Sequence, residues 1–206
     1  MAIEAEKRAA AEAAAELVGD GMTVGLGTGT TVGYLLRALA ARGLSLRCIA
    51  TSLQTERAAR ELGLAVETFN GIDRLDITID GADQIAPDRW LVKGGHGAHT
   101  REKVAAGASE RFVVIASSDK LVERLAPPVA LELLSFGLTA ILRELGDAKV
   151  RDVPPSPDGN VIAEYVGPVG DPAELAARFA ATPGVVEHGL FPPQLVTDVI
   201  VAGELL

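Results

Sequence analysis

Short apolar runs alternate along the first part of the chain with segments in which apolar residues recur every three or four positions. The short apolar runs predict buried strands over residues 22–26, 47–50, 65–68, 76–79, 91–92 and 112–116. The periodic segments predict amphipathic helices over residues 5–18, 31–41, 54–62 and 101–108. This alternation is typical of a parallel sheet covered on both faces. We therefore expect a Rossmann-like α/β domain with a mostly parallel sheet.

The pattern changes near Pro127. The predicted order from there is βαββαβ, with strands over 129–133, 149–153, 161–166 and 185–190 and helices over 136–145 and 172–181. That order indicates a ferredoxin-like α+β domain. A last strand over 197–202 is expected to return to the first sheet. The predicted division is therefore residues 1–126 with 195–206 as the Rossmann-like catalytic domain, and 127–194 as the smaller domain.

Composition favours a globular protein of the cytoplasm. Hydrophobic residues make up 48% of the 206 residues, which is ample for a core. No apolar run approaches the ~20 residues that a membrane span needs, and the first residues are charged. Cys48 is the one cysteine, so an internal disulfide is excluded, as a reducing compartment would predict. We expect a cytoplasmic location and no membrane partner.

The charge balance narrows the range of ligands. The chain has 19 Lys and Arg against 28 Asp and Glu, a net charge of −9. Nucleic-acid affinity rests mainly on basic side chains, so a nucleic-acid partner is not expected. A small anionic substrate is compatible, because a few backbone N–H groups and one or two lysines can outweigh a distant negative surface.

A glycine-rich segment, Gly25–Thr31, joins the first predicted strand to the next helix. Glycines let the backbone approach a ligand, and the free N–H groups of a helix start attract anions. Thr28, Thr30 and Thr31 add hydroxyl groups. The segment is not a dinucleotide fingerprint, because its third glycine comes one place too early, and it lacks the Gly-Lys-Ser/Thr of a P-loop. Phosphate binding and a plain strand-to-helix turn with a threonine cap both remain open.

Two carboxylates, Asp80 and Asp83, follow the strand predicted over 76–79. Ligands gather at the carboxyl ends of strands in open α/β sheets, so these groups could accept hydrogen bonds from sugar hydroxyls. The segment by itself also fits a Mg²⁺ site or a solvated turn held by Asp-to-backbone bonds.

The richest segment is Lys93–Lys103. Lys93 follows a predicted strand, and three nearby glycines leave N–H groups free for a developing oxyanion. Thr100 is expected to cap the next helix, which places Glu102 in its first turn. The helix dipole there favours the ionised carboxylate that a general base requires. The alternative is an ordinary first-turn acid. Further along, Lys120 offers a second cation or is a solvated surface lysine.

Taken in order, these segments resemble the type A ribose-5-phosphate isomerase family. The resemblance covers nearly the whole chain and includes further matches at Thr51-Ser52, 158–162 and 183–191. It implies an aldose–ketose isomerase that interconverts D-ribose 5-phosphate and D-ribulose 5-phosphate through an enediolate, in the non-oxidative pentose phosphate pathway.

The resemblance also implies a role for each matched residue. Glu102 matches the catalytic base, and Lys93, Asp80 and Asp83 match the residues around the reacting end of the sugar. The expected substrate contacts also include Lys7, Thr28, Gly29, Thr30, Thr31, Gly81, Ala82, Gly94, Gly95, His96 and Lys120. The resemblance implies no metal and no other cofactor, and a homodimer or higher homo-oligomer.

Three other functions compete with this one. His96 and His99 stand where the family usually has glycine and a small or apolar residue, which leaves an isomerase of another phosphosugar open. A non-catalytic sugar-phosphate-binding module is the second rival, although the chain keeps the expected base and has no helix-turn-helix segment. An acyl-CoA-handling enzyme on a similar sheet would normally need a longer chain.

Overall fold

A computed structural model describes residues 2–206, which form two compact units. The first consists of the chain up to Ala82, Arg101–Leu121 and Gln194–Leu206, and the second of Asp83–Thr100 and Val122–Pro193. The expected division assigned residues 83–100 to the first domain. They belong to the second unit because β6 (Leu91–Val92) pairs with β12 (Leu190–Phe191) and with β5 (Gln84–Ile85).

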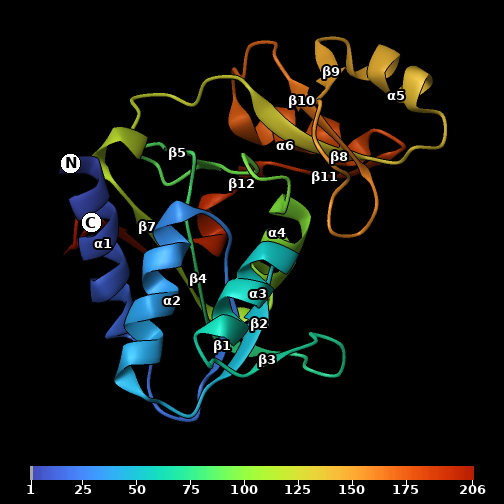
Figure 1. Ribbon diagram of the computed structural model, residues 1–206. Coiled ribbons are helices and arrows are strands. Elements are labelled where there is room, and N and C mark those ends of the chain that lie inside the picture. The colour runs from blue at the N-terminus through green and yellow to red at the C-terminus, as the bar shows by residue number, and fades with distance from the viewer. Residues whose placement is uncertain (1) are drawn as a thin grey trace. The chain divides into compact units, whose positions relative to one another are not determined.

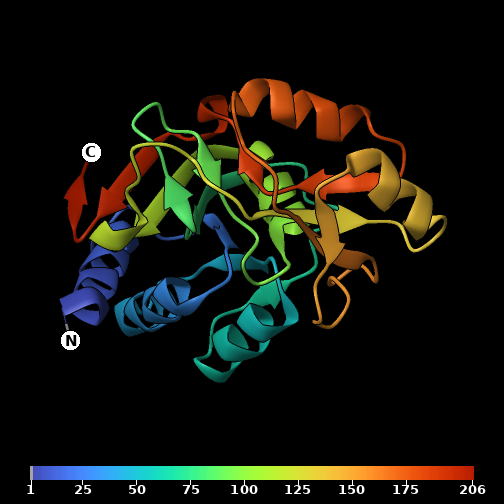
Figure 2. The ribbon, with the colours of Figure 1, turned by 90° about the horizontal axis from the view of Figure 1, so that it is seen from above.

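The first unit is built on a seven-stranded sheet in the order β14-β13-β7-β4-β1-β2-β3. Neighbouring strands are parallel except β13 and β14. The strands are β1 (Thr23–Leu26), β2 (Arg47–Ala50), β3 (Val66–Glu67), β4 (Leu75–Asp80), β7 (Ser109–Ala116), β13 (Asp198–Val201) and β14 (Glu204–Leu205). The return of the chain's end to this sheet is confirmed, since β13 runs beside β7 (Figure 2).

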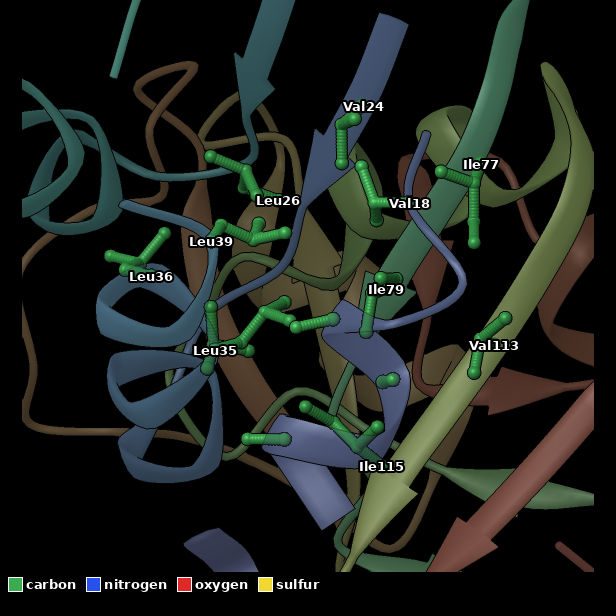
Figure 3. Packing of buried hydrophobic residues seen from close by; sticks show 14 of the residues in the cluster. Val18, Val24, Leu26, Leu35, Leu36, Leu39, Ile77, Ile79, Val113 and Ile115 are labelled. Atoms are coloured by element: carbon green, nitrogen blue, oxygen red, sulfur yellow. The ribbon is translucent and has the colours of Figure 1, made fainter. Parts of the chain in front are cut away.

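Helices α1 (Ala2–Ala15) and α2 (Thr30–Arg42) lie side by side over one face of this sheet (Figure 1). Leu35 and Leu39 are one helical turn apart, so they share the apolar side of α2. Figure 3 shows them among Leu26 and Ile79 of the strands, all fully buried in one cluster. Spacing along the sequence therefore selects the face that is buried.

The opposite face carries α4 (His99–Gly107). Cys48 packs under α1 and α2, whereas Ile49 packs with Leu75 and with Ala105 of α4. Successive residues of a strand point to opposite faces, so the sheet is covered on both. Helix α3 (Leu53–Glu61) lies beside β2 and β3 and is capped by Ser52.

The second unit contains the predicted βαββαβ arrangement. Its four-stranded antiparallel sheet has the order β11-β8-β10-β9, and one apolar cluster joins it to its two helices. The elements in chain order are β8 (Val129–Leu133), α5 (Leu138–Leu145), β9 (Ala148–Val150), β10 (Val161–Tyr165), α6 (Pro172–Ala181) and β11 (Val185–His188). The strand expected over 185–190 is in fact two, because the chain leaves this sheet after His188 to form β12.

Two short 3₁₀ helices, η1 (Ser118–Lys120) and η2 (Pro193–Leu195), complete the described elements. Within residues 2–206, no helix combines the length and the apolar character that crossing a membrane requires.

Cys48 provides a test of the packing on β2. Its side chain is fully buried, and this burial raises the pKa of the thiol to about 11. At pH 8 only about one thiol in a thousand is then ionised, whereas a solvated cysteine with a pKa near 8.5 is about one quarter thiolate. We expect almost no reaction with Ellman's reagent in the folded protein and one equivalent of thiol in denaturant. Rapid labelling of the folded chain would show that β2 is exposed by local opening.

Candidate active site

The candidate site in the first unit lies where the strand order of the sheet reverses. From β1 the chain builds outward through β2 and β3, and it then returns to the other side of β1 as β4. The carboxyl ends of β1 and β4 are therefore neighbours, and loops leaving them diverge. Such a switch point is where open α/β sheets bind ligands.

The loop after β1 is fixed to the carboxylate at the end of β4. The backbone N–H groups of Thr28 and Gly81 both donate to Asp80 Oδ1, over 3.0 and 2.7 Å. A Cβ atom at Gly27 would overlap this carboxylate, so only glycine lets the loop approach so closely. Asp80 is fully buried, which excludes the solvated turn for this residue.

The three threonines of the loop have different environments. The Thr28 hydroxyl is buried and lies 2.9 Å from Thr51 Oγ1 and 3.4 Å from Thr55 Oγ1. It therefore braces the loop against its neighbours. Thr30 is exposed and Thr31 half-buried at the start of α2, where first-turn N–H groups have no carbonyl partner within the helix.

The threonine cap expected as one alternative is absent. The N-cap residue of α2 is Gly29, with a φ of 129°, and it makes no side-chain cap hydrogen bond. The helix start is consequently presented by backbone groups, the arrangement in which helix termini bind anions.

Lys7 belongs to the first turns of α1, beside α2. Its ammonium lies 2.7 Å from Glu4 Oε1, and the other oxygen of Glu4 accepts a hydrogen bond of 2.8 Å from the Tyr34 hydroxyl of α2. The Glu4 carboxylate therefore holds Lys7 next to the second turn of the helix whose first turn carries Thr30 and Thr31.

Lys120, in η1, is tied to the same end of α1. The backbone N–H of Ser118 donates to Glu6 Oε2 over 2.7 Å, which joins η1 to α1. The Lys120 ammonium lies 3.3 Å from Asp119 Oδ2. A hydrogen bond from Ser117, and secondarily the charge of Lys120, lowers the pKa of the Asp119 carboxyl. Both predicted phosphate-binding lysines are thus attached to the beginning of α1.

In the second unit, Lys93 directly follows β6 and is almost completely buried. Its backbone N–H donates to Gly189 O over 2.8 Å, and its ammonium lies 5.4 Å from the centroid of the Phe191 ring. Lysine is seldom buried without a functional or structural reason, and an aromatic ring face at this distance attracts its ammonium group. This environment fits a lysine that acts on a ligand.

The glycine loop after Lys93 forms a tight turn, in which the Gly97 N–H donates to Gly94 O over 3.0 Å. Gly94 has a φ of 106°, and a Cβ there would lie 2.9 Å from Nδ1 of the His99 ring. His99 is fully buried beside this turn, whereas His96 is exposed at its tip. The two histidines therefore have different environments.

Asp83 closes the other side of this turn. Its Oδ2 accepts a hydrogen bond of 2.8 Å from the Gly95 N–H, and its own backbone N–H donates to Val92 O. The two aspartates of the Asp80-Gly81-Ala82-Asp83 run thus each bind loop N–H groups of their own unit. Among residues 2–206, no three His, Cys, Asp or Glu side chains are grouped to hold a metal ion.

Glu102 lies in the first turn of α4 and is only 3% exposed. The prediction that Thr100 caps this helix was wrong. Helix α4 begins at His99, and the Thr100 hydroxyl instead donates to Glu132 Oε2. The reason is that Glu132 is a fully buried carboxylate, which requires hydrogen-bond donors.

Several residues around this loop were not predicted. Besides Thr100, Glu132 Oε1 accepts bonds from Ser156 Oγ at 2.6 Å and Asn160 Nδ2 at 2.8 Å. An acidic residue inside the apolar run 129–133 was a usable signal for a buried polar site. Arg151, which donates to the Gly94 and Gly95 carbonyls, gave none, because those partners lie more than fifty residues away in the sequence.

Comparison with known proteins identifies the family. Residues 47–205 match the family model of ribose 5-phosphate isomerase A, also called phosphoriboisomerase A. The ribose-5-phosphate isomerase A of Caulobacter sp. (strain K31) is 42% identical over 93% of this chain and 91% of its own length. That of Methanoregula boonei is 44% identical over 98% of this chain and 91% of its own length.

Solved structures with the same fold lead to the same family. Ribose 5-phosphate isomerase A from Methanocaldococcus jannaschii superposes with a TM-score of 0.90 at 31% identity, covering 97% of each chain. A D-ribose-5-phosphate isomerase in complex with phospho-erythronic acid gives a TM-score of 0.92 at 30% identity, covering 100% of this chain and 99% of the other. The chain therefore belongs to the ribose 5-phosphate isomerase A family.

Proposed function

We propose that this chain catalyses the reaction of its family, the interconversion of D-ribose 5-phosphate and D-ribulose 5-phosphate, with Glu102 as the base. The observation that carries the assignment of the base is the position of Glu102: a carboxylate only 3% exposed, in the first turn of α4. A positioned carboxylate shielded from bulk water suits proton transfer to and from carbon.

The reaction moves one proton between adjacent carbons of the open-chain sugar. Glu102 takes the proton from C2, the electron pair of that bond forms the C1–C2 double bond, and the aldehyde oxygen O1 gains the negative charge. The resulting enediolate gains a proton at C1 from Glu102, and the proton on O2 passes to O1. The carbonyl group is then at C2, and no atom enters or leaves overall.

Lys93 and the glycine loop stabilise the enediolate oxygens. The Lys93 ammonium is held in an environment where an opposing charge is worth far more than in water. The turn that follows supplies the backbone N–H groups of Gly94 and His96, whereas the Gly95 N–H donates to Asp83. Asp83, fixed by this bond, holds a sugar hydroxyl or assists the transfer between O2 and O1.

The first unit binds the rest of the substrate. Gly29, Thr30 and Thr31 present backbone N–H groups and hydroxyls to the phosphate, helped by Lys7 and Lys120. Thr28, Gly81 and Ala82 act through their positions around Asp80, which holds a hydroxyl near the reacting end. No metal or other cofactor enters this scheme.

A phosphorylated sugar acid is the natural probe of this site. The carboxylate of phospho-erythronic acid carries its negative charge next to a chain of hydroxyls that ends in a phosphate, as the enediolate does. Because binding is strongest to groups that resemble the transition state, we expect this acid to compete with ribose 5-phosphate.

An isomerase of a different phosphosugar is the second candidate, favoured by the exposed position of His96 at the tip of the turn. A side chain there contacts the sugar where the family usually has none. To decide between ribose 5-phosphate and another phosphosugar, kcat/KM is measured for several aldopentose and aldohexose phosphates in the wild type and in His96→Gly. The physiological substrate is the one with the highest kcat/KM in the wild type.

A cytoplasmic location and a homodimer or larger homo-oligomer complete the proposal. Both rest on the family resemblance and on the sequence. Light scattering coupled to size-exclusion chromatography is expected to give twice the monomer mass or a higher whole-number multiple of it. A monomer at micromolar concentration would contradict this part of the proposal.

Replacement of the base gives the most direct test. Glu102→Gln keeps the shape of the side chain and removes its ability to accept the proton, so kcat should fall by at least about 10²-fold. Isomerisation of ribose 5-phosphate is measured in EDTA for both proteins. Near-normal turnover in the variant would refute the role of Glu102, and loss of wild-type activity in EDTA would refute the metal-free scheme.

The loop after β1 is tested by a pair of glycine variants. In Gly27→Ala the new methyl group overlaps Asp80, so we expect a loss of about 1–3 kcal/mol in stability and a large loss of kcat/KM. Gly33→Ala is the control. Residue 33 belongs to α2, and a methyl group added there would meet no atom within 4 Å. It should keep full activity and gain about 0.5–1 kcal/mol. Thermal unfolding and steady-state kinetics separate the two results.

A further inference from the structure

Arg151 binds the glycine loop from within the second unit. Its Nη1 donates to Gly94 O over 3.0 Å, and its Nη2 donates to Gly95 O over 2.7 Å. The planar guanidinium is well suited to two acceptors at once, because its donors form a rigid fork. Two successive carbonyl groups of the loop are therefore fixed by one side chain.

The arginine itself has a rigid attachment. It follows β9 directly, and its backbone N–H donates to Ile162 O of β10 over 3.0 Å, which continues the ladder between the two strands. A side chain anchored at a sheet can restrain a loop, whereas one on a mobile segment would move with it.

Fixing the carbonyls also fixes the N–H groups. The Gly94–Gly95 and Gly95–His96 peptide bonds are trans, so in each the N–H points away from the carbonyl oxygen. With the Gly94 and Gly95 carbonyls directed at Arg151, the Gly95 and His96 N–H groups point to the opposite side of the loop. Asp83 lies on that side, since its Oδ2 accepts the Gly95 N–H over 2.8 Å.

The peptide between Gly94 and Gly95 is thus held at both ends by opposite charges. The guanidinium polarises the carbonyl and the carboxylate polarises the N–H, and both effects increase the same dipole. Without them, a turn that contains three glycines would sample other peptide orientations at little cost. Arg151 is the member of this arrangement to which the proposed function assigns no contact with the substrate.

We propose that Arg151 is a positioning residue of the isomerase reaction, which directs the His96 N–H group and, through the Gly95 N–H, Asp83 toward the enediolate. The inference rests on the proposed function, in which this loop stabilises the oxyanion. It adds to the proposed roles of Lys93 and Asp83 a contribution of the second unit that is exerted through backbone orientation.

The test compares Arg151→Met and Arg151→Lys with Arg143→Met. Arg143 is an exposed arginine on α5 of the same unit, so its replacement removes the same charge without touching the loop. We expect kcat of Arg151→Met to fall by about 10- to 100-fold, because a misdirected donor loses transition-state stabilisation. Arg151→Lys should be intermediate, since an ammonium lacks the fork. The control should retain wild-type kcat.

Binding measurements distinguish positioning from general damage. In Arg151→Met the inhibition constant of phospho-erythronic acid should rise together with the loss of kcat, while that of inorganic phosphate stays within about twofold. Guanidinium ion, well below unfolding concentrations, should partly restore kcat of Arg151→Ala and leave Arg143→Ala unchanged.

Each contrary result has a separate meaning. A folded Arg151→Met with wild-type kcat overturns the positioning role and leaves the proposed function intact. A variant that loses affinity for the acid and for inorganic phosphate equally shows a structural role only, which also overturns the inference. Wild-type protein that neither isomerises ribose 5-phosphate nor binds the acid overturns the proposed function, and the inference with it.

Discussion

The hydrogen bonds from two loops to the carboxylate of Asp80 are the constraint on which the first unit's site depends. A buried carboxylate needs donors, and here the donors are the backbone N–H groups of Thr28 and Gly81. These N–H groups belong to the loops that follow β1 and β4, so one side chain fixes both loops at the switch point of the sheet. The absence of a side chain at Gly27 allows this approach, so a sequence feature as small as one missing methyl group shapes the site.

The second unit uses the same device with different residues. Its glycine turn is held by Asp83 on an N–H group and by Arg151 on two carbonyls, and the helix that follows is held by Glu132 on the Thr100 hydroxyl. Glycine-rich loops lose much conformational entropy on folding, and charged hydrogen bonds from rigid strands offset that loss. In both units the charged groups that bind the backbone lie in a strand or directly beside one in the sequence.

The sequence predicted most of the strands and all six α-helices, and it marked the candidate site residues, because each of these depends on neighbours along the chain. Apolar spacing identified the βαββαβ order, and the glycine runs and Asp80, Lys93 and Glu102 were visible as local patterns. The Thr100 cap was mispredicted, since its true partner Glu132 is thirty-two residues away. The role of Arg151 and the pairing of β6 with β12 could not be predicted for the same reason, because their partners are far away in the sequence. Local chemistry predicts elements, whereas long-range pairing decides which side chain holds which loop.

An acidic chain can bind an anionic substrate because most of its negative charges lie too far from the site to repel the substrate. Charges farther away than about 8 Å are largely screened at physiological ionic strength, so most of the net charge of −9 has little effect within the site. In the proposed function, the local groups that act on the phosphate and the enediolate are the start of α2, Lys7, Lys120 and the buried Lys93. Glu4 and Asp119, which pair with Lys7 and Lys120, orient these ammonium groups but also compete with the substrate for them. In the proposed function, phosphate binding therefore displaces two partly exposed ion pairs, which are individually weak.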